Sequence, residues 1–319
     1  MSDIFRYNRK QVFLLLPFYF YAEVAVMLYL WIVSLLWAFS FGLIKGQLTG
    51  LDASFVAFAR LFLAGLAFLP LLRLRGVDRR LALRLALIGA VQYGLMYVTY
   101  IYSFRFLKAY EVALFTIFTP LYVTLINDAY QRRLNGFSLL ATVLAVAGTA
   151  IVQQANLLSP DLTRGFLIVQ VSNLCFALGQ VAYREVMRRY PHVRDGQVFG
   201  LLYIGGALAA GLPALFTTPW GNFTLLPNQA LTLVYLGVVA SALGFFLWNV
   251  GARRVNAGTL AIFNDLKIPL AVVVSLLFFG EQADLLRLLI GGGVVLAALA
   301  LNEWNVRRRS APQMAASTD

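Results

Sequence analysis

Three polar residues stand close together in an otherwise apolar stretch, LAIFNDLKIPLAVVV (residues 260–274). Asn264, Asp265 and Lys267 offer an amide, a carboxylate and an ammonium group, and Pro269 follows two residues later. A charged side chain at the centre of a membrane-spanning helix costs about 2.5–3.5 kcal/mol on insertion scales, so it is retained where it faces protein or water. Such groups can bind a polar substrate or carry a proton. A structural ion pair between helices is the alternative.

Backbone geometry decides whether both charges can serve one site. Asp265 and Lys267 lie about 200° apart around a regular helix, so an irregular helix is needed to bring them together. Proline removes a backbone hydrogen bond and clashes with the carbonyl four residues earlier. Pro269 therefore predicts a kink that exposes the carbonyl of Asp265, and Pro120 predicts a kink that exposes the carbonyl of Thr116. We expect a substrate site at the kink before Pro269, with Asp265 as the candidate for proton coupling.

The composition indicates that these residues lie in a membrane. Hydrophobic residues make up 61% of the 319-residue chain, charged residues 13%, and the mean hydropathy is +0.77. Soluble domains typically carry about 25% charged residues. A spanning helix needs about 20 mostly apolar residues. The predicted class is an all-α integral membrane protein, with ten candidate spans at 28–44, 54–72, 84–104, 110–127, 137–153, 166–183, 196–216, 230–250, 257–279 and 285–303.

The distribution of basic residues predicts the orientation. With the N-terminus in the cytoplasm, most of the 26 lysine and arginine residues fall in cytoplasmic segments, as the positive-inside rule expects. The net charge of +12 is then explained by topology and by contact with anionic lipid, not by nucleic-acid binding. The sequence predicts a multi-pass protein of the cell inner membrane with both termini cytoplasmic.

Residues for enzymatic chemistry are scarce. The chain has one cysteine and one histidine, which argues against an intramolecular disulfide and a His/Cys metal site. It also has no G-x-x-x-x-G-K-[ST] motif for binding ATP. We expect neither an enzyme nor a metal or other cofactor.

Two stretches of the chain resemble each other. Residues 105–123 read RFLKAYEVALFTIFTPLYV, and residues 253–272 read RRVNAGTLAIFNDLKIPLAV. With one gap, Pro120 aligns with Pro269, and each copy falls in the fourth span of a five-span half. An odd number of spans turns the halves in opposite directions, as in secondary transporters that bind substrate at the repeat interface. Chance similarity between apolar helices is the alternative.

The predicted domains follow from this repeat. The first five-helix repeat covers 28–153, the second covers 165–303, and residues 304–319 form a cytoplasmic tail. Residues 1–27 are either an N-terminal leader lying in the membrane interface or a segment ahead of a natural start at Met27.

Several motifs resemble the EamA-type drug/metabolite transporters. They are WIVSLLWAFSFGLIKG, FARLFLAGLAFL and YLGVVASALGFFLWNVGARRVNAG, the last followed by N-x-x-x-x-P and FFGEQ. The resemblance covers about residues 28–303. It implies ten helices in two inverted repeats, secondary transport of small metabolites or amino acids, and a central cavity. NDAYQRRL (127–134) departs from the family because it lacks the Gly-Glu pair that FFGE (278–281) keeps.

Further polar and aromatic residues occupy candidate cavity positions. Tyr97 belongs to a pattern of tyrosines on one face of the third candidate span. Asn173 and Gln180 lie seven residues apart, on one face of the sixth candidate span. Polar side chains can equally bond one helix to another. Trp37 could stack on a substrate. The predicted substrate-binding residues are Trp37, Tyr97, Asn173, Gln180, Asn264, Asp265 and Lys267.

Arg60 lies within the second candidate span. We expect it to be a structural charge that pairs with Glu111 or Glu281.

These patterns favour a secondary transporter that moves a small metabolite, such as an amino acid, organic acid or amine, by alternating access, with proton coupling as an option. The alternatives are a channel or a structural membrane protein. The expected partners are a small-molecule substrate and the lipid bilayer, for a monomer or homodimer.

Overall fold

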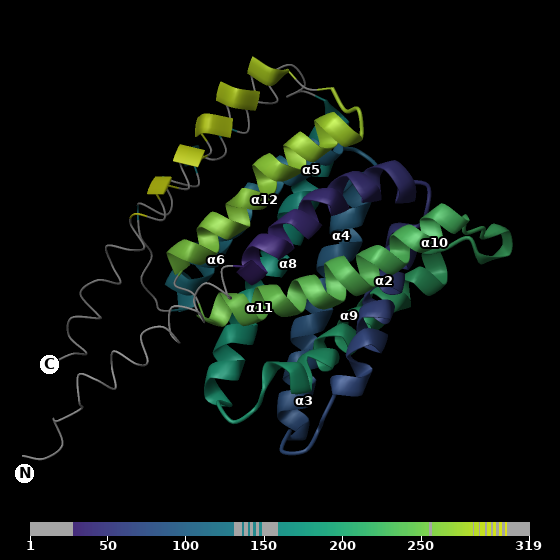
Figure 1. Ribbon diagram of the computed structural model, residues 1–319, viewed down its shortest axis with the longest axis vertical. Coiled ribbons are helices and arrows are strands. Elements are labelled where there is room, and N and C mark those ends of the chain that lie inside the picture. The colour runs from purple at the N-terminus through teal and green to yellow at the C-terminus, as the bar shows by residue number, and fades with distance from the viewer. Residues whose placement is uncertain are drawn as a thin grey trace, which may run out of the picture.

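The computed structural model describes residues 28–130, 159–254 and 257–282, together with parts of 136–148 and 284–304. Within 257–265 only the side chain of Phe263 is described. All regular structure in these ranges is helical (Figure 1). Beyond the first helix, which starts at Leu28, the labelled helices are α2 (Ala53–Phe68), α3 (Arg79–Gly89), α4 (Met96–Ser103), α5 (Ala109–Phe115), α6 (Thr119–Tyr130), α8 (Pro160–Arg189), α9 (Asp195–Thr217), α10 (Pro227–Val234), α11 (Gly244–Arg254) and α12 (Ala257–Phe278).

Seven helical stretches of the described chain are long and apolar enough to cross a membrane. They are Leu28–Leu48, Ala53–Leu71, Arg79–Ser103, Ala109–Tyr130, Pro160–Arg189, Asp195–Thr217 and Pro227–Arg254. α12 contributes a shorter apolar stretch, Leu266–Phe278. The predicted span 137–153 falls largely, and the span 285–303 partly, outside the described residues, so the ten-helix arrangement and the inverted repeat remain predictions.

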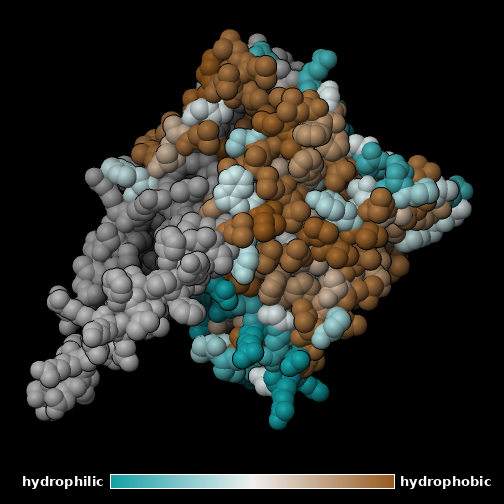
Figure 2. All heavy atoms as spheres, in the orientation of Figure 1, coloured by the Kyte–Doolittle hydropathy of each residue, from teal (hydrophilic) through white to brown (hydrophobic). Residues whose placement is uncertain are grey.

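The outer surface of the described chain is apolar. On α9, Phe216 and Leu208 are 82% and 70% exposed. Figure 2 shows apolar atoms over most of the visible described surface, with hydrophilic residues gathered at the end where α3 begins. A soluble monomer rarely exposes so continuous an apolar surface. The protein is therefore a multi-pass membrane protein.

Side-chain caps fix where several helices begin. Asp52 accepts a hydrogen bond of 2.9 Å from the backbone N–H of Phe55 at the start of α2. The same Oδ1 atom accepts hydrogen bonds from the hydroxyl groups of Thr217 and Thr218 at the end of α9. Such caps satisfy N–H groups that lack a partner in the first turn. The Asp52 carboxylate therefore also joins α2 to α9.

Glycines allow α3 and α9 to pack backbone against backbone. A Cβ atom on Gly89 would lie 1.9 Å from the carbonyl oxygen of Leu202, and one on Gly205 would lie 1.9 Å from that of Ala86. Small residues let membrane helices approach this closely. The crossing requires glycine at both positions.

Irregular helical turns interrupt several spans. π-Helical segments occupy Ile44–Leu48, Ala90–Leu95 and Tyr235–Leu243, and a 3₁₀ turn occupies Thr116–Phe118 directly before Pro120. By contrast, Pro269 lies inside α12, which continues as a helix to Phe278. Irregular turns within helices often mark functional sites.

Candidate functional site

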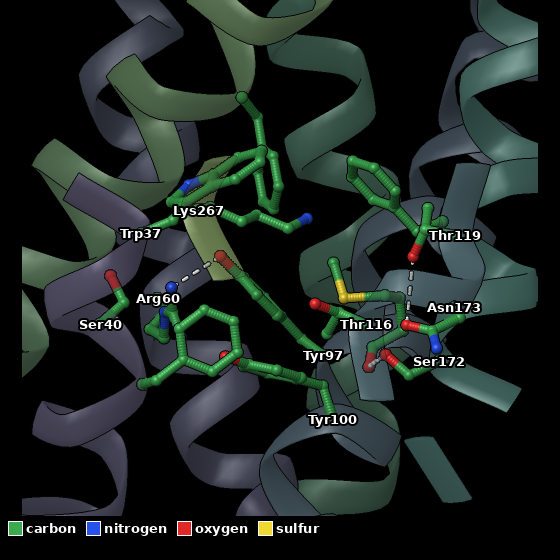
Figure 3. Close-up of a pocket in the computed structure, with 14 residues that line it drawn as sticks. Trp37, Ser40, Arg60, Tyr97, Tyr100, Thr116, Thr119, Ser172, Asn173 and Lys267 are labelled. Carbon is green, nitrogen blue, oxygen red and sulfur yellow. Dashed lines mark hydrogen bonds between the residues drawn. The ribbon is translucent and has the colours of Figure 1, made fainter. Parts of the chain in front are cut away.

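A central cavity lies between the first helix, α2, α4, α5, α6, α8, α11 and α12 (Figure 3). Its empty volume is about 560 Å³, including the space on its open side. The cavity is open on one side, and side chains from several spanning helices meet in it.

Two cationic side chains line this cavity, and no carboxylate does among the described residues. Arg60 of α2 and Lys267 of α12 are 2% and 6% exposed. The Lys267 ammonium lies 5.3 Å from the centre of the Trp37 ring, and the Arg60 guanidinium carbon lies 4.1 Å from the centre of the Tyr97 ring. Cations at such distances from an aromatic face are stabilised by it. The described lining therefore favours an anionic or acceptor-rich ligand.

Arg60 is held by groups from two other helical segments. Its Nη2 atom donates to the Tyr97 hydroxyl at 2.6 Å, and its Nε atom donates to Ser241 Oγ at 3.3 Å. Ser241 lies on the π-helical segment Tyr235–Leu243. Glu281, one of the two carboxylates with which the sequence paired Arg60, instead accepts from the backbone N–H groups of Ala109 and Tyr110. The predicted pairing of Arg60 with Glu281 is therefore wrong, because the Glu281 carboxylate caps the N-terminus of α5.

Aromatic rings form one wall of the cavity. The Trp37 ring centre lies 5.3 Å from that of Phe245 and 5.2 Å from that of Trp248. Trp37 Nε1 donates to the carbonyl of Ala240 at 2.9 Å. Trp248 Nε1 donates to Gln180 Oε1 at 3.3 Å. The hydrogen bonds hold both indoles in place, and the face of Trp37, which lines the cavity, can pack against an apolar part of a ligand.

The side chain of Asn173 forms hydrogen bonds to both sides of the irregular turn between α5 and α6. Its Nδ2 atom donates to the carbonyl of Phe115 at 2.8 Å, and its Oδ1 atom accepts from the Thr119 hydroxyl at 3.2 Å. The carbonyl of Thr116, which the sequence predicted to be exposed, accepts instead from the backbone N–H of Thr119 within the 3₁₀ turn. The freed carbonyl is one residue earlier, at Phe115, and a side chain of α8 satisfies it.

The structure brings some of the predicted residues together and not others. Trp37, Tyr97, Asn173 and Lys267 line the same cavity. Gln180 lies behind the aromatic wall and lines a separate, smaller hollow. The side chains of Asn264 and Asp265 lie outside the described residues.

Sequence reasoning missed the small hydroxyl residues of the cavity. Ser40, Thr116, Thr119 and Ser172 all line it. Helical spacing did not single them out. The available signals were the position of Ser172 directly before Asn173 and that of the two threonines within one turn before Pro120.

Apolar spanning helices around a central cavity with buried charges are typical of a membrane transport protein. The comparisons with known proteins identify its family. The model of the EamA-like transporter family matches residues 24–153 and 163–303. The chain belongs to this family, which confirms the resemblance seen in its motifs.

Curated relatives match over nearly their whole length. A probable biotin transporter of Pseudomonas aeruginosa is 43% identical over 281 residues, covering 86% of this chain and 97% of that protein. Biotin transporters of Salmonella typhimurium and Escherichia coli K12 are each 38% identical over 293 residues, covering 90% of this chain and 95% of those proteins. The chain is a small-molecule transporter and not an enzyme, as its sequence predicted.

A solved crystal structure resembles the protein with a TM-score of 0.64. It is 18% identical and covers 90% of this chain and 99% of its own. At this identity the likeness shows the fold alone.

Proposed function

We propose that this protein carries biotin across the cell inner membrane. Its relatives at 38–43% identity are named as biotin transporters. The observation that carries the proposal is a cavity with two buried cations, an aromatic wall and no described carboxylate. Biotin is a monocarboxylate with an aliphatic chain and a fused ring that contains a cyclic urea. Its chemistry therefore fits that of the cavity.

In this proposal Lys267 holds the carboxylate of biotin. The Lys267 ammonium is a compact charge on a flexible stem, and it lies over Trp37. An aliphatic chain that ends in a carboxylate can lie along the aromatic wall and reach this ammonium. The apolar surroundings strengthen the attraction between the opposite charges.

Transport proceeds by alternating access between two inverted five-helix halves, 28–153 and 165–303, with both termini in the cytoplasm. The sequence similarity around Pro120 and Pro269 and the cavity between helices of both halves support this arrangement. Asp265 carries a coupling proton, because an ionisable residue within a spanning helix is a candidate proton carrier.

Exchange in proteoliposomes tests the substrate and the role of Lys267. Vesicles loaded with unlabelled biotin should accumulate labelled biotin from outside, whichever direction transport takes in the cell. Lys267→Met should slow exchange at low biotin about 10- to 150-fold, because a hydrogen bond to a charged group contributes about 1.5–3 kcal/mol. Lys267→Arg, the matched control, keeps the charge and should retain part of the activity. Absence of exchange by the wild type would refute biotin as substrate, and unchanged exchange by Lys267→Met would refute the role of Lys267.

A pH gradient tests the coupling. We expect an imposed gradient to drive net biotin movement through the wild type and not through Asp265→Asn, which cannot release a proton. The variant should still exchange labelled for unlabelled biotin, because exchange needs no coupling. Gradient-driven movement at the wild-type rate in Asp265→Asn would exclude this carboxylate as the proton carrier.

A further inference from the structure

Arg60 is a buried cation whose hydrogen bonds leave one end of the guanidinium open. Its side chain is 2% exposed and lines the central cavity. Among the described residues its Nη1 atom is buried and has no hydrogen-bond partner. Arginine stays protonated in proteins and has no acceptor of its own, and an unsatisfied buried donor is costly. An acceptor delivered by a ligand would remove this cost.

The hydrogen bonds around Arg60 fix which group donates and which accepts in this cluster. Ser241 Oγ donates to the carbonyl of Leu236 at 2.7 Å. In the 2.9 Å contact between Tyr97 and Ser241, the tyrosine hydroxyl must therefore be the donor. Tyr97 in turn accepts from Arg60 Nη2, and Ser241 accepts from Arg60 Nε. The guanidinium is therefore held rigidly through Nε and Nη2, and Nη1 is its one nitrogen without a described partner.

Hydroxyl groups of the 3₁₀ turn Thr116–Phe118 and of α8 offer hydrogen-bond acceptors instead of donors. The hydroxyl of Thr116 donates to the carbonyl of Ala113 at 2.7 Å, and that of Ser172 donates to the carbonyl of Met96 at 3.1 Å. Their protons are engaged, so the lone pairs of these two oxygens remain for the cavity. In Figure 3 these hydroxyl residues lie across the view from Arg60, and Lys267 extends between the two groups. The cavity thus has a donor side and an acceptor side.

We infer that Arg60 is a substrate-binding residue that donates from Nη1 to the ureido carbonyl of biotin. The ureido N–H groups then face the hydroxyl oxygens of Thr116 and Ser172, and the carboxylate lies at Lys267. This inference rests on the proposed function. It replaces the purely structural role that the sequence gave Arg60.

The alternative placement, with the carboxylate at Arg60, fits the described contacts less well. The Nε and Nη2 edge, which could grip both carboxylate oxygens at once, is already occupied by Ser241 and Tyr97. A carboxylate also offers only acceptors, so it cannot satisfy the acceptor side of the cavity. A cyclic urea offers one carbonyl and two N–H groups. The rigid ring suits the rigidly held guanidinium, and the flexible acid tail suits the flexible ammonium of Lys267.

Two analogues, each altered at one end of biotin, test the assignment. Iminobiotin replaces the ureido oxygen with a nitrogen that is protonated at neutral pH, and biotin methyl ester lacks the acid. Their inhibition of labelled-biotin exchange, relative to that by biotin, gives a preference that does not depend on the amount of active protein. The wild type should prefer biotin over iminobiotin by about 100-fold or more, since sites built to bond a polar group strongly reject its replacement. Arg60→Met should reduce this preference to about tenfold or less and leave the preference over the methyl ester unchanged.

Three variants serve as controls. Lys267→Met should show the reverse pattern, with loss of the preference over the ester alone. Tyr97→Phe removes a partner of Arg60 without removing Nη1, and it should keep the preference over iminobiotin. Arg60→Lys keeps a charged donor and should keep part of that preference.

Specific outcomes overturn the inference. Arg60→Met with the wild-type preference over iminobiotin shows that Arg60 does not contact the urea. Loss of the preference over the ester in Arg60→Met places the acid at Arg60 instead. Failure of Arg60→Met to fold leaves Arg60→Lys to decide, and a preference equal to that of Tyr97→Phe there would point to a structural role. A wild type that shows no exchange of biotin refutes the proposed function itself, and the inference with it.

Discussion

The two ends of α12 differ in how two parts of the chain are joined. The earlier part runs to the end of α6, and the later part starts at α8. At the C-terminal end, Gly280 adopts the left-handed conformation with φ of 64° and ends the helix. The Glu281 carboxylate then accepts from the backbone N–H groups of Ala109 at 2.8 Å and Tyr110 at 3.0 Å. Beside it, Lys108 Nζ donates to the carbonyl of Gln282 at 3.0 Å. We call this group of residues the Glu281 lock.

At the opposite end of α12, exposed side-chain hydrogen bonds join α8 to α6. Arg184 donates to Asn127 Oδ1 at 3.0 Å, and Arg189 donates to the Tyr130 hydroxyl at 3.0 Å. The described ion pairs at this end, Arg253 with Asp195 and both Arg188 and Arg189 with Glu185, lie wholly within the later part of the chain. Among the described contacts, the C-terminal end of α12 thus joins the two parts through the Glu281 carboxylate, and Asp52 joins them between α2 and α9.

The difference indicates which end is held closed. A carboxylate at a helix N-terminus gains charge-assisted hydrogen bonds and a favourable interaction with the helix dipole. Exposed pairs on flexible side chains contribute about 1 kcal/mol or less. In the proposed alternating-access cycle, we expect the Glu281 lock to be a contact that breaks when the described state converts. The missing Gly-Glu pair in NDAYQRRL (127–134) suits the weaker contacts at the other end.

Glu281→Ala should have the largest effect on this comparison. Loss of hydrogen bonds to a charged group should destabilise the described state by about 2–4 kcal/mol, enough to change the ratio of two conformations about 30- to 1,000-fold. The readout is the thiol-labelling rate of Ser40→Cys in the cavity, in a background where the native Cys175 is replaced by alanine. Labelling should accelerate at least about tenfold.

Two matched variants separate the carboxylate from the turn that positions it. Glu281→Gln keeps one acceptor oxygen and should show a smaller acceleration. Gly280→Val forces a branched residue into the left-handed conformation and should misplace Glu281, although a Cβ there would meet no neighbour within 4 Å. Gly50→Val, also with open space around it, is the control. Unchanged labelling in Glu281→Ala would show that this end is held closed by something else.

The lock also shows how far sequence reasoning could go. Hydrophobic runs predicted the described spans, because apolar length alone decides whether a helix can cross a membrane. The FFGE motif was visible as a family feature, but its use of Gly280 to aim Glu281 at α5 was not. That contact joins residues 172 positions apart, and no helical spacing encodes it.

The cavity was predictable to a similar degree. Lys267 was found because a charge in an apolar run is conspicuous. The role of Asn173 was not found, since it depends on a helix break in another span. Arg60 was assigned to a carboxylate on the expectation that a buried cation needs an anion. The structure gives it Tyr97 and Ser241, from segments 37 and 181 positions away.

The smallest effect is expected at the other end of α12. Arg184→Gln and Arg189→Gln each remove one exposed hydrogen bond between α8 and α6, which contributes about 0.5 kcal/mol or less. Arg189→Gln also removes an exposed ion pair with Glu185 within α8. Thiol labelling of Ser40→Cys should stay within about twofold of the parent, because 0.5 kcal/mol is too little to move the equilibrium further. The thermal unfolding midpoint in detergent gives a second measure of how much these two variants change stability. If either glutamine variant accelerated labelling as much as Glu281→Ala, the ends would be held with equal strength, and the lock could not be assigned to Glu281.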